Sequence, residues 1–482
     1  MRPRLVLALI TGWASAVVAQ SGEDTLLIAR VEHGLRSPVT VDGRPAVHFT
    51  LLDRMAALRV PGVSIAVLDS GRIVWARGYG VRDAGGTDPV TSETLFQAAS
   101  ISKPVATIGM LRLVDRGLLD LDRDINGYLQ SWQVPENRFT RPGIVTLRRL
   151  VSHSAGLTIH GFPGYPVGAD LPTLPQILSG LRPANTGPVV VDTLPGTVWR
   201  YSGGGITVMQ LAMTEVTGLP FDRLMRELVL DPFGMSGSSY SQPLEPARAV
   251  RAASGHRRDG SVIPGKWHVY PEQAAAGLWT TPSDLARVAL TVWRLDRGES
   301  DLLSPDLTRQ MLSIQNAPSG LGFMLEQDGD DLRFHHGGSN NGFRATFVAS
   351  RHRGQGAVIM TNGDQGEQLA AELLQAVALE YRWPWLGPRV VRPARLRRTL
   401  LEGTAGRYRV MGTSDVVADI TLADGRLYFE VAGTVDRTEL VPLDDQRFVA
   451  LDLGWEVTVE RQGKNGRGTA IIVMGTRAIR IE

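Results

Sequence analysis

Hydrophobic and polar residues alternate with two different periods along the first third of the chain. The runs Val63 to Leu68 and Ile73 to Arg77 are β-prone, and Asp69-Ser70-Gly71-Arg72 between them is typical of a turn, which predicts a hairpin. From about Ser100 the hydrophobic positions recur every three or four residues instead, which predicts a helix that ends near Gly117. This part of the chain therefore mixes strands and helices.

The mixed pattern continues up to residue 381. The segment from Gln130 to Pro282 is rich in glycine, proline and short helical patterns, of which Ile206 to Val216 is one. Two β-prone runs follow, around Arg344 to Val348 and Ala357 to Met360. A helical run from Glu367 to Tyr381 completes this unit.

The character of the chain changes after this unit. Five arginines fall within residues 389–398, next to several prolines, and we interpret this segment as a solvated linker. Short alternating strands dominate beyond it, and Asp424-Gly425 and Asn465-Gly466 each separate two β-prone runs, as in hairpins. Residues 399–482 are therefore predicted to form a small all-β sheet or barrel domain without a titratable cluster of its own.

The N-terminus has the pattern of a targeting segment. Arg2 and Arg4 precede an apolar run from Leu5 to Val18, and Ala19 offers a small residue for cleavage. A retained membrane anchor is the alternative, but the run is short for a span of about 20 residues. We expect residues 1–19 to be a signal peptide that is removed. The mature chain would then be exported, periplasmic or secreted, with no stable membrane span.

Composition excludes several classes of chemistry. With 43% hydrophobic and 21% charged residues, the 482-residue chain is expected to be globular, and its net charge of +2 gives no reason to expect a nucleic-acid partner. It has no cysteine, which excludes disulfides, thiolate nucleophiles and cysteine-ligated metals. The nine histidines are scattered and no H-E-x-x-H motif occurs, so no metal or cofactor is expected.

Ser100 and Lys103 form the first candidate for chemistry. Residues three apart lie on the same face of a helix, so the hydroxyl and the amine can approach one another. A serine becomes a nucleophile when a neighbouring base takes its proton, and a desolvated lysine can do so whereas arginine cannot. The chain has 48 arginines and only three lysines, which makes Lys103 informative. The alternative is a helix-capping serine beside a surface lysine.

Several further blocks accompany this pair in order along the chain. They are Phe96 to Ala99, Leu150-Val151-Ser152-His153-Ser154-Ala155-Gly156-Leu157, Pro195 to Ser202, Asp231 to Met235, Gly277 to Leu285 and Phe334 to Ser339. Together with Ser100 and Lys103 they resemble the serine β-lactamase and DD-peptidase clan, in particular class C β-lactamases and the related D-aminopeptidases and esterases. The resemblance runs from about Val60 to Trp383.

The resemblance implies a fold and an activity. The fold would be α+β and β-lactamase/transpeptidase-like over residues 20–388, with an antiparallel sheet flanked by helices, a helical subdomain and the active site between them. Residues 399–482 resemble the small lipocalin-like domains appended to some clan members. The activity would be two-step acyl transfer on a small-molecule or short-peptide substrate, without a metal or cofactor.

The resemblance also implies roles for individual residues. Ser100 would be acylated, with Lys103 as its proton acceptor. Tyr201 would be a general base or proton shuttle, which requires a phenol perturbed by Lys103 because a free phenol has a pKa of about 10. His336-Gly337-Gly338 would form the strand edge along which the substrate lies. The backbone N–H groups of Ser100 and Ser339 would form the oxyanion hole.

Two departures from the family pattern concern the substrate. Gly203 stands where β-lactamases usually carry an asparagine, and His336 stands where they usually carry a lysine that holds a carboxylate. Both favour an esterase, amidase or D-amino-acid peptidase with at most weak β-lactam hydrolysis. Arg344, just after the third motif, could attract a carboxylate instead, or it could have a packing or surface role.

The sequence thus predicts an exported serine hydrolase that acts on an ester, amide or D-amino-acid peptide. An α/β-hydrolase is disfavoured because no G-x-S-x-G motif occurs. The alternative is a catalytically weak module of the same fold that binds peptidoglycan fragments or a partner. The intact set of Ser100, Lys103 and Tyr201 argues against this alternative, since a binding protein has no need of all three.

Overall fold

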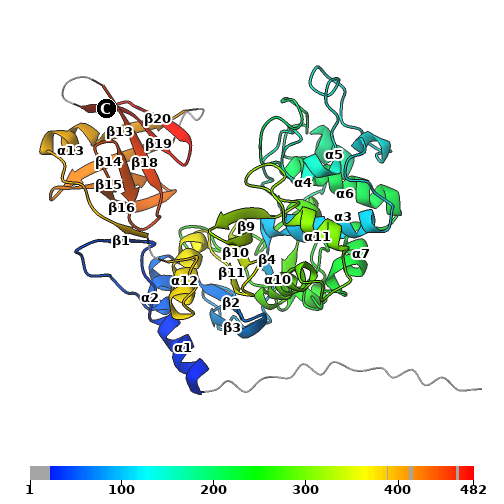
Figure 1. The fold of residues 1–482 in the computed structure, drawn as a ribbon, viewed down its shortest axis with the longest axis horizontal. Helices are drawn as coiled ribbons and strands as arrows, with labels where there is room; N and C mark the ends of the chain where they lie inside the picture. The colour runs from blue at the N-terminus through cyan, green and yellow to red at the C-terminus, as the bar shows by residue number, and fades with distance from the viewer. Residues whose placement is uncertain (1–21, 388, 412–415, 463–465) are drawn as a thin grey trace, which may run out of the picture.

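The computed structural model describes residues 22–387, 389–411, 416–462 and 466–482. The predicted signal peptide, residues 1–19, lies outside the described residues. Figure 1 shows a large unit of helices and sheet and, beside it, a smaller C-terminal barrel. Of the helices within these ranges, none is both long and apolar enough to span a membrane.

A six-stranded antiparallel sheet lies at the centre of the large unit, in the order β3-β2-β11-β10-β9-β8. Its strands are β2 (Gly62–Asp69), β3 (Arg72–Gly80), β8 (Met324–Asp328), β9 (Asp331–Asn340), β10 (Phe343–Ser350) and β11 (Gly356–Thr361). The predicted hairpin corresponds to β2 and β3, and the two later β-prone runs correspond to β10 and β11. The expected antiparallel sheet of an α+β fold is therefore confirmed.

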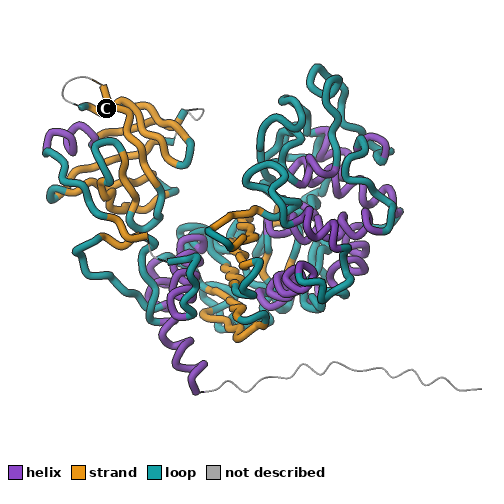
Figure 2. Tube along the Cα trace, in the orientation of Figure 1, coloured by secondary structure: helices purple, strands orange, loops and turns teal. Residues whose placement is uncertain are grey.

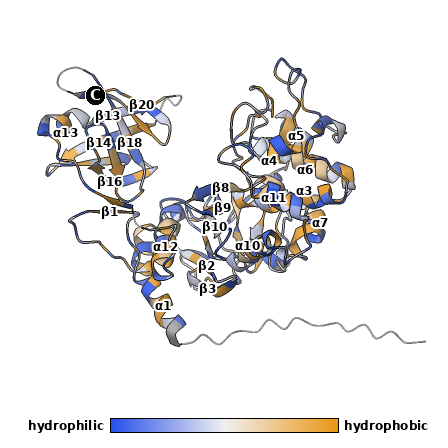
Figure 3. Ribbon diagram, in the orientation of Figure 1, coloured by the Kyte–Doolittle hydropathy of each residue, from blue (hydrophilic) through white to orange (hydrophobic). Residues whose placement is uncertain are grey.

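Both faces of this sheet are covered by helices because successive strand residues point to opposite sides. On β2, Ile65 and Val67 belong to a core with α1 (Gly22–Glu32), α2 (Leu51–Ala57) and α12 (Gly366–Glu380). Ala66 and Leu68 belong to the core of the other face, which includes α10 (Pro282–Asp296). In Figure 3, α12 carries hydrophobic and hydrophilic colour, in keeping with one buried side and one exposed side.

A helical region extends from the second face of the sheet (Figure 1). Its helices are α3 (Ser102–Asp115), α4 (Leu147–Val151), α5 (Leu174–Ser179), α6 (Gly203–Thr217), α7 (Phe221–Met225), α8 (Pro246–Ala249), α9 (Gln273–Ala276) and α11 (Pro305–Met311). Two short strand pairs tie its segments together: β4 (Phe96–Gln97) with β7 (Trp279–Thr280), and β5 (Tyr165–Pro166) with β6 (His268–Val269). The predicted helical subdomain is present, and the long helix α3 runs through its core.

The C-terminal part closes into an eight-stranded antiparallel barrel, shown in orange at the left of Figure 2. Its strands are β13 (Gly406–Val410), β14 (Val417–Ala423), β15 (Arg426–Val431), β16 (Val435–Pro442), β17 (Arg447–Ala450), β18 (Glu456–Gln462), β19 (Arg467–Val473) and β20 (Thr476–Arg480). The hairpin at Asp424-Gly425 joins β14 and β15 as expected. Strands β18 and β19 form the second hairpin, whose turn residue Asn465 lies outside the described residues.

The arginine-rich segment 389–398 contains more structure than a solvated hinge. Its first residues form β12 (Arg389–Val391), which pairs in parallel with β1 (Val39–Val41). Its last residue, Arg398, begins α13 (Arg398–Thr404). Residues 392–397 between them belong to no helix or strand. A strand was not expected here because its hydrogen-bonding partner lies some 350 residues earlier in the chain.

Candidate active site

Ser100 lies in a tight turn that leads into α3. Residues Ala99–Ile101 form one turn of 3₁₀ helix, and α3 itself begins at Ser102, two residues after the predicted start. Ala99 has a φ of 49°, a left-handed conformation that costs a non-glycine residue energy. The turn is held from both sides, because Ala98 N donates to Leu278 O at 2.9 Å and Ile101 N donates to Ala98 O at 3.1 Å. Ser100 is thus presented from a well-anchored segment.

Lys103 is buried directly beside Ser100. Its Nζ donates to Ser100 Oγ at 2.9 Å and to the backbone carbonyl of Ala275 at 2.8 Å. None of the ion pairs found among the described residues involves Lys103, and burial lowers its pKa to about 7. A neutral amine therefore exists at neutral pH within reach of the serine hydroxyl. The alternative of a surface lysine beside a capping serine does not fit this geometry.

Tyr201 completes a three-residue cluster with Ser100 and Lys103. Its ring centroid lies 4.9 Å from Lys103 Nζ. The adjacent Ser202 caps α6 by accepting a hydrogen bond from Gly205 N at 2.9 Å, which places Tyr201 just before this helix. Burial raises the pKa of Tyr201 far above its usual value, and only a hydrogen bond with the Ser100 side chain opposes this rise. Tyr201 is therefore a neutral phenol at physiological pH.

This finding corrects one part of the sequence-based expectation. The role of Tyr201 as a base was expected to depend on perturbation of its phenol by Lys103. In the structure the dominant influence on its pKa is burial, which acts in the direction opposite to the one a phenolate base requires. The geometry suits a phenol that donates and relays a proton, the second of the two roles considered.

Two histidines beside Tyr201 were not identified as site residues from the sequence. The imidazole centroids of His153 and His160 lie 4.3 Å and 4.8 Å from the Tyr201 ring centroid. Burial lowers the pKa of both, and the charge of Lys103 lowers it further. His153 is in the Leu150-to-Leu157 block, which was the available signal, whereas His160 belongs to none of the motifs. Both are uncharged at neutral pH and enclose the phenol.

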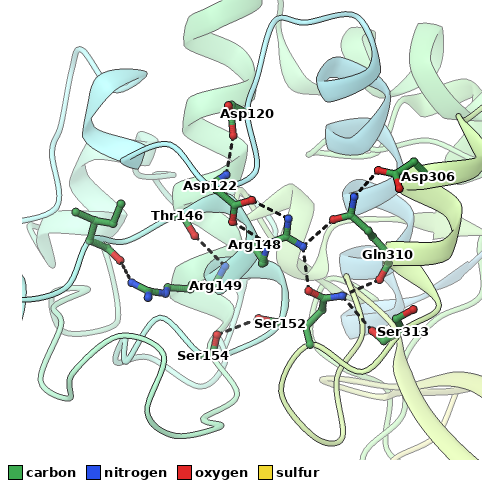
Figure 4. Close-up of polar contacts among 12 residues, drawn as sticks. Asp120, Asp122, Thr146, Arg148, Arg149, Ser152, Ser154, Asp306, Gln310 and Ser313 are labelled. Atoms are coloured by element: carbon green, nitrogen blue, oxygen red, sulfur yellow. Dashed lines mark hydrogen bonds and ion pairs between the residues drawn. The ribbon is translucent and has the colours of Figure 1, made fainter.

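Helix α4 ends two residues before His153 and is held by the polar contacts of Arg148 that Figure 4 shows. Arg148 donates to both carboxylate oxygens of Asp122, at 2.7 and 2.8 Å, and to the side-chain oxygens of Gln310 and Gln315. These contacts tie α4 to two other parts of the helical region. Downstream, the Ser202 backbone N donates to His153 Nδ1 at 3.3 Å, which connects this segment to the start of α6.

The third predicted motif lies on β9, opposite the Ser100 turn. Strand β8 pairs with β9 only from Asp331 to His335, so His336 to Asn340 form an edge without a strand neighbour on that side. A Cβ atom on Gly338 would lie 2.2 Å from Ala98 O, which explains why glycine stands at this position. The close backbone approach brings the β9 edge against the turn that holds Ser100. Ser339 follows and lines the same cleft.

His336 contributes a hydrogen-bond acceptor to the cleft rather than a charge. Its Nδ1 lies 2.6 Å from Gly337 O, and its buried Nε2 has no hydrogen-bond partner within the described residues. An Nδ1 that donates to this carbonyl leaves Nε2 as the unprotonated nitrogen. Burial, aided by the charge of Lys103, lowers the pKa of His336 to about 3. The position therefore lacks the cation that a lysine would supply.

The structure also explains the second departure from the family pattern. A Cβ at Gly203 would lie 3.1 Å from both His160 O and the ring of Phe162, so a larger residue here requires the neighbours to move. Arg344, which was considered as a carboxylate ligand, donates to the carbonyls of Asn340 and Phe343 and pairs with Asp364 at 3.0 Å. Its guanidinium is occupied, which leaves Arg344 with a packing role.

These residues enclose one cleft of about 780 Å³, a size typical of small-molecule sites. Ser100, Lys103, Tyr201, His336, Gly338 and Ser339 all line it. The structure thus brings together every residue that the sequence placed in the site. Groups of three or more side chains suited to hold a metal ion were not found in the described part of the chain.

Comparisons with known proteins agree with this geometry. The family model described as Beta-lactamase matches residues 50–382. A penicillin-binding protein of Bacillus subtilis is 21% identical over 82% of this chain and 89% of its own length. Esterase EstB of Burkholderia gladioli is 29% identical over 47% of this chain, and the match spans 58% of the esterase. The octameric penicillin-binding protein homologue from Pyrococcus abyssi superposes with a TM-score of 0.58 at 20% identity, covering 89% of this chain and 98% of the homologue.

Proposed function

We propose, from the premise that the chain belongs to the beta-lactamase family of serine hydrolases, that it is an exported enzyme with Ser100 as its nucleophile. Its substrate would be a small ester, an amide or a D-amino-acid peptide. The observation that carries the proposal is the contact of 2.9 Å between Lys103 Nζ and Ser100 Oγ, in a buried setting that lowers the pKa of the amine to about 7.

Acylation begins with proton transfer from Ser100 Oγ to the neutral Lys103 amine. The oxygen attacks the substrate carbonyl carbon, and the carbonyl oxygen gains negative charge. The N–H groups of Ser100 and Ser339 are the donors that would stabilise this charge. Collapse of the intermediate breaks the bond to the leaving group and leaves an ester on Ser100. Water then attacks this ester, with Lys103 again as the proton acceptor, and the bond between Ser100 Oγ and the acyl carbon breaks. The acid is released, and the Lys103 ammonium returns its proton to Ser100 Oγ.

Tyr201 moves the proton that the leaving group needs. Because burial keeps it a neutral phenol, it donates its proton to the departing oxygen or nitrogen and recovers one from the Lys103 ammonium. The Tyr201 ring centroid lies 4.9 Å from Lys103 Nζ, and the Ser100 side chain is the group that opposes the burial-driven rise in the pKa of Tyr201. The proton taken from the serine is thus returned to the product without an external acid.

The charges of the cleft favour substrates that bear no carboxylate at the third motif. His336 is neutral at physiological pH, and the guanidinium of Arg344 is occupied by two carbonyls and Asp364. A β-lactam or a peptide with a free carboxylate would find no free cation at these two positions. Esters and amides are therefore expected to be turned over faster than cephalosporins.

The test compares wild type with Ser100→Ala on p-nitrophenyl acetate, p-nitrophenyl butyrate and a chromogenic cephalosporin. Ester turnover should be lost in Ser100→Ala and retained in Ser236→Ala, whose serine is exposed and lies outside the cleft. Intact mass spectrometry should show an acyl adduct on wild type and on Ser236→Ala but not on Ser100→Ala. Absence of both turnover and adduct would instead support the binding module. Export is tested separately, by finding Gln20 as the first residue of the mature protein.

A further inference from the structure

A second cavity opens from the end of the catalytic cleft. Its volume is about 550 Å³, and Ser339, Arg344 and Glu367 line both the cleft and this cavity. Ser339 carries one of the N–H groups assigned to the oxyanion hole. The second cavity therefore begins beside the reacting bond, and a substrate longer than the cleft can extend into it.

The barrel forms the far wall of this second cavity. Residues 433–438, at the β15–β16 turn and the start of β16, line it together with Leu453 and Trp455. Asp436 pairs with Arg258 of the catalytic unit at 2.8 Å. Thr438 Oγ1 donates to Asp452 at 3.0 Å, and Asp452 N donates back to Thr438 Oγ1 at 3.1 Å. The wall is thus braced within the barrel and attached to the catalytic unit.

Eight of the lining residues are charged, and five of these eight are in ion pairs. The lining includes Arg54, Arg258, Arg344, Arg437, Asp364, Glu367, Asp436 and Asp452. Among the described residues, Arg437, Glu367 and Asp452 are in none of the ion pairs, but Asp452 accepts hydrogen bonds from Ser37 and Thr438. Arg437 and Glu367 belong to opposite walls. The Arg437 guanidinium carbon lies 4.0 Å from the centre of the Tyr428 ring, so stacking orients its N–H groups. Glu367 is exposed in the first turn of α12.

We infer that this second cavity is a subsite for a peptide extension of the substrate, an inference that rests on the proposed function. A peptide backbone offers N–H donors to Glu367 and carbonyl acceptors to Arg437. A free carboxylate at the end of the peptide would also pair with Arg437. A long alkyl chain is the wrong chemistry for this space, because it would strip water from charged groups without replacing their hydrogen bonds. The barrel is then part of the substrate-binding site.

The test uses ester-linked peptides extended by one to four residues on either side of the scissile ester, in both the D and the L series. In wild type, kcat/KM should rise with length on one side. Arg437→Ala and Glu367→Gln should each reduce that rise by about tenfold or more, as expected for loss of a charged hydrogen bond. Turnover of p-nitrophenyl acetate should not change in Arg437→Ala, because Arg437 lines the second cavity and not the catalytic cleft. Arg409→Ala is the matched control, because Arg409 is an exposed barrel arginine that lines neither cavity.

The outcomes separate this inference from the proposed function. If p-nitrophenyl acetate turnover depends on Ser100 but peptide length has no effect on either side, the subsite assignment is wrong. The proposed hydrolase function is then unaffected. A length effect that survives in Arg437→Ala and Glu367→Gln likewise overturns the subsite. If these variants reduce turnover of long alkyl esters rather than of peptides, the peptide assignment is wrong. Absence of any Ser100-dependent turnover overturns the proposed function itself.

Discussion

Two basic side chains on opposite faces of the central sheet have pKa values that are shifted in opposite directions. Arg54, on α2, donates to both oxygens of the fully buried Glu372 of α12 at 2.7 Å, and this contact raises the pKa of the guanidinium. Lys103, on α3, is more completely buried, its hydrogen bonds go only to a hydroxyl and a carbonyl, and its pKa falls to about 7. Burial is common to both sites. The presence of a carboxylate is what separates them.

The comparison shows how the fold lowers the pKa of a lysine far enough for its amine to accept a proton at neutral pH. Burial disfavours a charge unless a counter-charge offsets the loss of water. At Arg54 the counter-charge is present, and the pair ties α2 to α12. At Lys103 no carboxylate forms an ion pair with the amine, so its protonated and neutral forms coexist near neutral pH. A cation held in an ion pair and an amine with a lowered pKa thus differ by one partner residue.

The largest effect is expected on activity, when Lys103 is replaced by arginine, the residue type found at the Arg54 site. Lys103→Arg keeps the charge and removes the ability to accept a proton, because an arginine stays protonated in proteins. We expect kcat/KM on p-nitrophenyl acetate to fall by about 10²–10⁴-fold, the usual contribution of a general base. Circular dichroism of the variant should match wild type. Retention of most of the activity would show that Lys103 is not the base.

The second prediction concerns the stability of the protein when Arg54 loses its counter-charge. Glu372→Gln leaves a buried guanidinium without its counter-charge, and we expect the free energy of unfolding to fall by about 3 kcal/mol. The double variant Arg54→Met, Glu372→Leu should cost much less, since no charge is left unpaired. Urea denaturation of the three proteins measures both values. An equal cost for single and double variants would mean that packing, rather than charge, explains the loss.

The smallest effect concerns the pH dependence of the Lys103 site. The folded chain releases the Lys103 proton near pH 7 and an unfolded lysine does so at about 10.4, so between these values the unfolded state binds more protons. The free energy of unfolding therefore rises with pH in this window, by on the order of 1 kcal/mol per pH unit at most. Lys103→Met should lack this rise. Urea denaturation at pH 6 and pH 9 tests it.

The pH–rate profile gives an independent reading of the same group. Since only the neutral amine accepts the Ser100 proton, kcat/KM should rise as the pH passes through about 7. A profile that falls over this range would assign the base to another residue. In the denaturation experiment, a difference in unfolding free energy between wild type and Lys103→Met that does not change with pH would mean that the folded amine keeps its usual pKa.

Local features of the fold were predictable from the sequence because short-range geometry determines them. Residues three apart share a helix face, so the Ser100–Lys103 contact followed from spacing once a helix was assigned. The β2–β3 hairpin and α12 likewise followed from periodicity and turn residues. The parallel pairing of β12 with β1 did not, because a strand carries no mark of which distant edge accepts its hydrogen bonds.

The sequence by itself determined which groups could react: a serine, one of only three lysines in a chain with 48 arginines, and a strand edge that contains glycine. The tertiary structure decided the state of those groups. It buried Lys103 without a carboxylate, kept Tyr201 a phenol, placed His153 and His160 beside it and engaged Arg344 elsewhere. The physical reason is that burial and charge pairing are sums over neighbours from many segments, and those neighbours exist only once the chain has folded.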